Sequence, residues 1–467
     1  MANTLKADYL VIGAGAVGMA FTDTLLAESD ATVIMVDRQH KPGGHWNMAY
    51  PFVTLHQPSQ FYGVQSLELG TGQKDEVGLN KGLFDLATGA QVCGYYEQLM
   101  QHRFLPSGRV QYFPMCNVNE EGRFTALLSG EQYTVEVKKR VVDAAYHMPS
   151  IPSTHTPNFQ IDDDVHFVPP NELPRLTKPA GGYVVIGGGK TGIDTCLWLL
   201  QNGVTPDSIR WIMPRDAWLL DRRNAQPDKE FFEYSIGNIA TQMQAIAEAE
   251  SIDDMFDRLE AGGYFLRLDP SVRPSMFHAA TISQAELSEI RKIKQVVRLG
   301  RVKHLTATKI ELADGSIPTS VDQVHIDCTA SAITLRPPKP IFESRRITPQ
   351  LVRAYQPVFS ASFIAFIEAS ERTDAEKNQL CGVLPPPDKD IDFVRFTAAG
   401  MMNQYLWSQA DDIKPWLKTN RLDGFTVLMS GVPKDDEVKQ RILSKLRDNS
   451  VPAMNKLQQF IRSASSA

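Results

Sequence analysis

The feature that most constrains the fold of this chain is an internal repeat. Residues 9–26 (YLVIGAGAVGMAFTDTLL) and residues 183–200 (YVVIGGGKTGIDTCLWLL) align without a gap at an offset of 174, and eight of the 18 positions are identical. Each block is a run of strand-forming residues, then G-x-G-x-x-G, then an apolar helical pattern. Two such motifs in the same strand-turn-helix context predict two dinucleotide-binding units rather than two unrelated tight turns.

Strand patterns extend both units. Residues 31–37 (ATVIMVD) are nearly all apolar, as expected of a second parallel strand that is buried on both faces. Residues 209–213 (IRWIM) take the corresponding place after the second block. Residues 122–143 alternate in polarity and are interrupted at 129–131 (SGE), which predicts a β-hairpin.

The order of the patterns places the second unit inside the first. A polar-rich, mostly helical stretch follows the second unit's early strands, and strand character then returns before a largely helical C-terminal part. The predicted fold class is α/β, with two Rossmann-like dinucleotide-binding domains, the second nested in the first, a helical insertion and a helical C-terminal segment. The predicted bounds are 1–170 and 325–467 for the first domain with its C-terminal segment, 171–324 for the second domain and 227–294 for its insertion, while residues 463–467 are expected to lack order.

The first glycine motif carries the residues that a bound dinucleotide needs. Gly13 permits the tight turn, Gly15 lets the backbone approach a pyrophosphate, and Gly18 allows close packing of helix and strand. Asp37 stands 19 residues after the last glycine, at the end of the second strand, where a carboxylate accepts hydrogen bonds from ribose hydroxyls and repels a 2′-phosphate. The motif therefore favours FAD or NAD(H) over NADP(H).

The second motif has a different ribose end. Its glycines are Gly187, Gly189 and Gly192, with Lys190 and Thr191 between the last two, and Arg215 follows 23 residues after Gly192. A guanidinium at that place binds a 2′-phosphate through two hydrogen bonds, which favours NADP(H), although Arg215 beside Asp216 also fits a surface ion pair. The run Gly189-Lys190-Thr191 is not a nucleoside triphosphatase P-loop, because Val184 stands where that motif has its first glycine.

Charge and cysteine usage exclude several classes of protein. The 48 Lys and Arg against 54 Asp and Glu give a net charge of −6, so no overall basic field attracts nucleic acid. The nearest two of the five cysteines are 23 residues apart, which excludes a local zinc knuckle or a dithiol redox motif, and no metal site is predicted. No stretch reaches the roughly 18 apolar residues of a membrane span and no signal peptide is recognisable, so a cytoplasmic location is expected.

After Asp37 the chain continues with residues 38–46 (RQHKPGGHW), whose GGxW segment lies one short loop beyond the ribose carboxylate. This segment resembles the class B flavoprotein monooxygenases, which include flavin-containing, Baeyer-Villiger and N-hydroxylating monooxygenases. The resemblance extends to about residue 331 and includes Arg215 before the DAW of residues 216–218. It implies FAD in the first domain, NADPH in the second, and oxygen insertion into a small organic substrate through a C4a-(hydro)peroxyflavin.

The resemblance also implies roles for individual residues. His56 and Gln57, in the loop of residues 50–57, are the candidate donors to the flavin ring and the candidate catalytic residues, although either histidine of this region also fits an ordinary polar residue. The other expected cofactor-binding residues outside the glycine motifs are Arg38, Gly44, His45, Trp46, Thr329 and Gln356.

Two other functions use the same domains. A flavoprotein reductase or dehydrogenase would pass hydride from NADPH to another acceptor without oxygen insertion, and a redox-sensing protein would bind NADP(H) without turnover. Disulfide reductases share the two-domain plan but need the cysteine pair that the spacing excludes. Small-molecule substrate and oxygen are therefore the expected partners, and the substrate and oligomeric state are left open.

Overall fold

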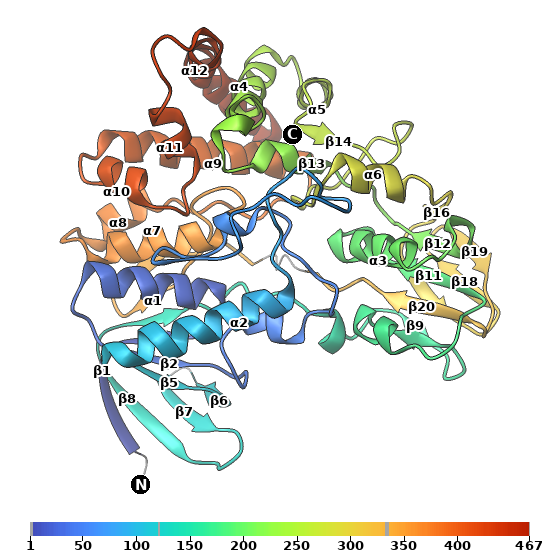
Figure 1. Cartoon of the computed structure of the whole chain (residues 1–467), viewed down its shortest axis with the longest axis horizontal. Coiled ribbons are helices and arrows are strands. Elements are labelled where there is room, and N and C mark those ends of the chain that lie inside the picture. Colours follow the sequence, from blue (N-terminus) through green and yellow to red (C-terminus); the bar gives the residue numbers. More distant parts are fainter. Residues whose placement is uncertain (1–2, 120–121, 332–335, 467) are drawn as a thin grey trace.

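A computed structural model describes residues 3–119, 122–331 and 336–466 of the chain. Two sheet-containing units lie beside each other, with a helical layer across one side of both (Figure 1). The α/β class with two dinucleotide-binding units is confirmed.

The first unit is built on a mainly parallel sheet of eight strands within the described residues. The strand order is β21-β22-β8-β1-β2-β5, and β7 joins β6 to β8. The predicted hairpin is β7 and β8, and the central strand β2 (VIMV) is buried at all four positions, as its sequence predicts. The strands are β1 (Asn3–Ile12), β2 (Val33–Val36), β5 (Val110–Phe113), β6 (Cys116–Val118), β7 (Arg123–Ala126), β8 (Gln132–Asp143), β21 (Phe342–Glu343) and β22 (Arg346–Ile347).

Helices from distant parts of the sequence cover this sheet. Helix α1 (Ala16–Glu28) follows β1 directly and packs against α7 (Pro357–Ala369). Helix α2 (Gly89–Leu99) contributes Val92, Tyr96 and Leu99 to the same core. A short ribbon of β3 (Gly63–Val64) and β4 (Leu67–Glu68) lies near α1.

The second unit contains a fully parallel five-stranded sheet in the order β10-β20-β11-β12-β16. Helix α3 (Lys190–Gln201) follows β11, so the second repeat has the same strand-turn-helix form as the first. The five strands are β10 (Phe167–Val168), β11 (Gly182–Ile186), β12 (Ile209–Ile212), β16 (Gln295–Val297) and β20 (Gln323–Asp327). A second, four-stranded sheet has the order β19 (Gly315–Pro318), β18 (Lys309–Leu312), β17 (Val302–Leu305) and β9 (Gln160–Ile161). Strands β9 and β10, which precede residue 170, pair with strands of this unit. The predicted domain bounds stay a prediction.

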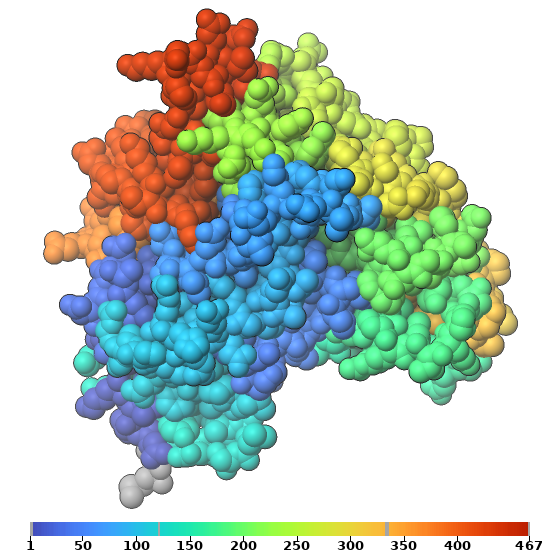
Figure 2. Space-filling model, viewed as in Figure 1, coloured from blue at the N-terminus to red at the C-terminus, as the bar shows by residue number. Residues whose placement is uncertain are grey.

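The predicted insertion and the C-terminal segment form one helical layer, seen at the top of Figure 1. Their shared core contains Phe256 and Phe265 of the insertion together with Phe393 and Leu457 of the C-terminal segment. The insertion also contributes two strands to a three-stranded sheet, so it is not purely helical. The elements are β13 (Leu219–Asp221), α4 (Phe232–Glu248), α5 (Ile252–Ala261), β14 (Phe265–Leu266), β15 (Thr281–Ile282), α6 (Gln284–Ile290), α8 (Asp374–Leu380), α9 (Asp390–Gln409), α10 (Ile413–Thr419), α11 (Phe425–Ser430) and α12 (Glu437–Ser466). Figure 2 shows this layer, in yellow-green and red, against the blue N-terminal part.

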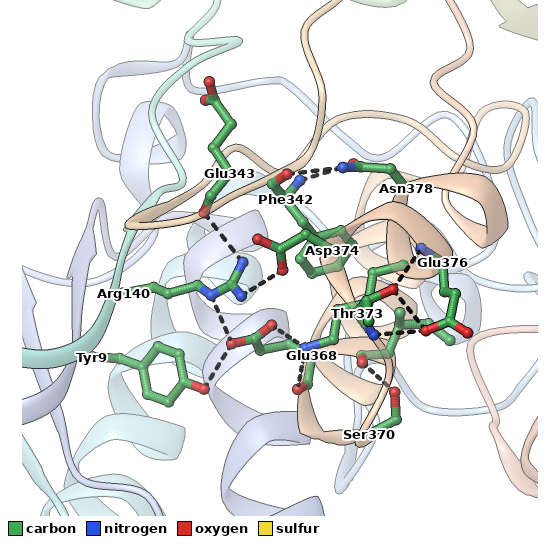
Figure 3. Close-up of polar contacts among 12 residues, drawn as sticks. Tyr9, Arg140, Phe342, Glu343, Glu368, Ser370, Thr373, Asp374, Glu376 and Asn378 are labelled. Carbon is green, nitrogen blue, oxygen red and sulfur yellow. Dashed lines mark hydrogen bonds and ion pairs between the residues drawn. The ribbon is translucent and has the colours of Figure 1, made fainter.

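A buried ionic cluster ties α7 to the first sheet (Figure 3). The Glu368 side chain, on α7, accepts a hydrogen bond of 2.9 Å from the Tyr9 hydroxyl and pairs with Lys377 at 2.7 Å and Arg140 at 3.3 Å. Because a buried charge is costly unless it is paired and hydrogen-bonded, these partners fix the position of α7 relative to β1 and β8.

One sequence prediction about a helix end was wrong. Helix α12 continues to Ser466, because each further residue of an established helix adds one hydrogen bond, and the Ser465 hydroxyl donates to the Ile461 carbonyl at 2.9 Å. Residue 467 lies outside the described residues. Helix α7 begins at Pro357, since proline is well accommodated in the first helical turn. None of the helices within the described residues is long and apolar enough to cross a membrane.

Candidate active site

The first glycine turn leaves the start of α1 without side-chain caps. Its N-cap is Gly15, no side chain accepts a hydrogen bond from the first amides, and the first turn has no acidic residue. By contrast, α2, α6 and α8 each begin with a capping box built on Thr88, Ser283 and Thr373. The exposed amides and the positive end of the helix dipole make this turn suited to an anionic group such as a pyrophosphate.

The GGxW loop packs directly against this turn. The Gly43 amide donates to the Ala14 carbonyl at 2.9 Å, and a Cβ atom on Gly44 would lie 2.9 Å from the Gly15 Cα. Gly44 also has a φ of 57°. Only glycine fits this contact, because a side chain would both clash and require the left-handed backbone region.

Asp37 sits at the end of β2, as predicted, and is buried. One carboxylate oxygen accepts the Ala14 amide, and the other accepts the Gln39 amide at 2.7 Å. Burial raises the pKa of this carboxyl group, and the two amides act in the opposite direction. The nearby Tyr112 hydroxyl is buried and has no hydrogen-bond partner within the described residues. Arg38, by contrast, is exposed on the surface.

An aromatic segment follows. The Trp46 indole donates to the Tyr62 hydroxyl at 2.9 Å, and His45 stacks on Trp46 with ring centroids 5.2 Å apart. Burial lowers the pKa of His45 to about 4, so its imidazole is neutral at physiological pH. This segment forms a largely apolar aromatic wall.

That wall borders a cavity of about 490 Å³ between the two units. Val17, from the first turn of α1, lines it, and so do Lys190 and Thr191 from the first turn of α3. The N-terminal ends of both repeat helices therefore reach the same cavity. The remaining wall comes from Ala330 and from segments 45–62, 147–152, 278–281, 349–361 and 384–396.

His56 and Gln57 both line the cavity. The pKa of His56 lies well below its usual value, first because of burial and then because of the positive charges of Lys190 and Arg222. Arg222 is itself buried, where its Nε donates to the His56 carbonyl at 3.0 Å and it pairs with Glu286 at 2.7 Å. His56 is therefore a neutral donor or acceptor rather than a cation.

Gln356 is the N-cap residue of α7 and lines the same cavity. Its side chain is only 4% exposed, and its carbonyl oxygen Oε1 has no hydrogen-bond partner in the described structure. A buried amide oxygen without a donor costs free energy, so this atom marks a place where a ligand would supply the missing hydrogen bond.

The second glycine turn is also free of side-chain caps, with Gly189 as the N-cap of α3 and no acidic residue in the first turn. Lys190 pairs with Asp194 one helical turn later. The Tyr50 hydroxyl donates to the same carboxylate at 2.7 Å, and burial raises the pKa of Tyr50 well above its usual value. The chain Tyr50–Asp194–Lys190 thus links the aromatic loop of the first unit to the second turn.

The structure brings some predicted residues together and places others elsewhere. His45, Trp46, His56, Gln57, Lys190, Thr191 and Gln356 share the cavity wall. Thr329 is exposed and bonds to Asp327 at 2.6 Å and His155 at 3.1 Å, while its neighbour Ala330 lines the cavity. Arg215 pairs with Asp388, at 3.1 and 2.8 Å, and not with the adjacent Asp216. Within the described ranges, no three His, Cys, Asp or Glu side chains gather as a metal site requires.

Comparison with known proteins identifies relatives over almost the whole chain. The uncharacterized protein Rv2000 of Mycobacterium tuberculosis and the uncharacterized protein Mb2023 of Mycobacterium bovis are each 45% identical over 463 residues, which cover 99% of this chain and 86% of the relative. The chain belongs to the family of these mycobacterial proteins. No protein-family profile matches it.

Among solved structures, the polycyclic ketone monooxygenase of the fungus Thermothelomyces thermophila aligns with a TM-score of 0.52 and 12% identity, over 97% of this chain and 89% of that enzyme. At this identity the likeness establishes the fold alone. The predicted α/β fold is confirmed, since the chain shares its fold with this monooxygenase.

Sequence reasoning missed several residues of the candidate site in this chain. Tyr112, Asp194 and Asp388 belong to no motif, and Asp194 and Asp388 contact Tyr50 and Arg215 from 144 and 173 residues away in the sequence. One signal was available: Asp194 lies one helical turn after Lys190 in the second repeat, the spacing of an ion pair on a helix.

Proposed function

We propose that this protein is an FAD-dependent, NADPH-consuming monooxygenase that inserts one oxygen atom into a small organic substrate. The observation that carries the proposal is the shared cavity, since the uncapped starts of α1 and α3 both open onto it. Two dinucleotides bound at these turns would bring their reactive rings into one enclosed space.

The first unit fits FAD. Its glycine turn offers amides to the pyrophosphate, and Asp37 with the unpartnered Tyr112 hydroxyl lies at the ribose end. Trp46 and Gln356 line the cavity that Val17 of the first turn of α1 also lines. The Gln356 Oε1 atom has no hydrogen-bond donor within the described residues. When bound, FAD supplies the redox chemistry and the activation of oxygen.

The chain's own residues would screen and orient that chemistry. The aromatic wall at His45 and Trp46 would limit the access of water to the cavity, which would reduce side reactions with water there. His56, held neutral, can donate or accept one hydrogen bond without introducing a charge. The reaction mechanism expected from the resemblance stays a prediction, as does the role of each site residue.

The second unit supports NADPH through its own uncapped turn and through Arg215 beyond β12. The aligned fungal enzyme is a monooxygenase of polycyclic ketones, and the largely apolar cavity wall here is compatible with an uncharged organic substrate of that general kind.

Oxygen-isotope transfer tests the proposal. Purified protein should retain FAD, oxidise NADPH, and incorporate ¹⁸O from ¹⁸O₂ into the product when apolar ketones, sulfides and amines are supplied. NADPH oxidation that only reduces an added electron acceptor, with no labelled product from any substrate, would support the reductase alternative. Protein that neither takes up FAD nor oxidises NADPH would contradict both.

A further inference from the structure

The residue predicted to hold the 2′-phosphate of NADPH is already bound by the chain itself. Both terminal nitrogens of Arg215 donate to the Asp388 carboxylate, at 2.8 and 3.1 Å. His278 lies on the same carboxylate, 2.9 Å from its Oδ1. Hydrogen bonding to Arg215 is the main reason that the pKa of Asp388 is lowered, so the carboxylate is ionised at neutral pH.

A second guanidinium beyond the adjacent strand is also engaged by carboxylates. Arg298 follows β16, which pairs with β12, and makes two hydrogen bonds to Asp216, at 2.7 and 2.9 Å. It also lies 3.5 Å from Asp269. The two arginines are therefore opposed by three carboxylates. A dianionic group can take over this two-point contact on Arg215 only if Asp388 gives it up.

Asp388 lies next to the cavity's border in the sequence. It follows Pro386 and Pro387, which line the cavity, and its backbone carbonyl accepts the Phe277 amide at 3.0 Å. His278 lines the same cavity from the segment that precedes β15. The Asp388 carboxylate, just before α9, thus contacts Arg215 beyond the end of β12 and His278 before β15.

We propose that Asp388 is an internal competitor for the 2′-phosphate and sets the nucleotide selectivity of the second unit. In the unliganded protein it satisfies Arg215. Binding of a 2′-phosphorylated nucleotide exchanges the carboxylate for the phosphate on the same guanidinium and releases the 386–388 segment from β12. The inference rests on the proposed NADPH site, and it assigns Asp388 a role in specificity and not in the chemical step.

Nucleotide fragments test this without turnover. The FAD-loaded protein is titrated calorimetrically with 2′,5′-ADP, which carries the 2′-phosphate, and with 5′-AMP, which lacks it. Asp388→Asn should bind 2′,5′-ADP about fivefold or more tightly than the unmodified protein, because the neutral amide competes less well for the guanidinium, and the affinity for 5′-AMP should change less than about twofold. Asp388→Ala should act in the same direction, and thermal unfolding checks that each variant is folded.

Asp163→Asn is the matched control, since it removes the same charge at an exposed position in the loop before β10 and should leave both affinities unchanged. As a second readout, saturating 2′,5′-ADP, but not 5′-AMP, should accelerate amide exchange in residues 388 and 389 of the unmodified protein.

The outcomes separate the two proposals. If Arg215→Ala weakens 2′,5′-ADP binding while both Asp388 variants leave it unchanged, the competitor role is wrong and the NADPH site stands. Equal gains for 2′,5′-ADP and 5′-AMP would also overturn it. If neither fragment binds any form of the protein, the nucleotide site itself is wrong.

Discussion

The two glycine turns have the same backbone design but different surroundings. In the first, the polar group at the ribose end, Asp37, is held by backbone amides, and the GGxW loop is pressed against the turn through Gly15 and Gly44. In the second, the side chains around the turn are held by other side chains, in the pairs Lys190–Asp194 and Arg215–Asp388. Under the proposed function, the first turn is already arranged for its dinucleotide, whereas the second would exchange contacts when one binds.

Two glycine substitutions, one in the loop packed against the first turn and one in the second turn, give the largest expected difference. Gly44→Ala should destabilise the protein by about 2–4 kcal/mol and abolish FAD retention, because its Cβ would meet Gly15 and its backbone is left-handed. Gly189→Ala should cost less than about 1 kcal/mol, since a Cβ there meets no atom within 4 Å. Urea unfolding and flavin absorbance measure both. Similar losses in the two variants would mean that the turns do not differ in tightness.

The side-chain contacts of the second turn give the next effect. Arg215→Ala should raise the KM for NADPH relative to that for NADH by about 10- to 100-fold, or roughly 1.5–3 kcal/mol of charge-assisted hydrogen bonding. For Arg215→Lys, the ratio of the two KM values should lie between those of the unmodified protein and Arg215→Ala, because lysine keeps the charge but loses the two-point contact. Equal changes for both nucleotides would remove Arg215 from the 2′-phosphate site.

A pH titration examines the aromatic segment of the first unit. The pKa of His45 is about 4 in the folded protein and near 6.5 when unfolded, so between these values the unfolded chain binds more protons. Stability should therefore be unaffected by His45 above pH 6.5 and should fall by about 1–2 kcal/mol as the pH drops from 6.5 to 5. The free energy of unfolding, measured across this range, should depend less on pH in His45→Gln. An unchanged slope would show that His45 is solvated.

The smallest expected effect concerns Gln356, whose side-chain oxygen has no hydrogen-bond donor within the described residues. Gln356→Leu should leave the FAD-free protein equally stable or about 0.5–1 kcal/mol more stable, because it removes an unsatisfied buried oxygen, while FAD affinity falls. Gln350→Leu is the matched control. That side chain also lines the cavity, but it bonds to both backbone groups of Lys339, so its loss should cost about 1–3 kcal/mol. Destabilisation of the same size in both variants would indicate that Gln356 is satisfied without a ligand.

Features that depend on neighbouring residues could be predicted from the sequence. The turns, the strand that ends at Asp37 and the aromatic loop follow from local patterns, and the repeat supplied the nested order. Asp388 could not be predicted to bind Arg215, because 173 residues separate them and only the packing of the insertion against the C-terminal helices brings them together. For the same reason, Glu368 shows no sign in the sequence of its contact with Tyr9.

The shared helical core has a consequence for the order in which the protein can fold during synthesis. Helices α4 and α5 are complete by residue 261, but Ala453, Leu457 and Phe460 of α12, which pack in the same core, follow about 190 residues later. At roughly 5–20 residues per second, the ribosome needs on the order of 10–40 s to supply them. During that interval the apolar faces of the insertion lack their final partner, so this part of the nascent chain is where chaperone contact or aggregation should concentrate.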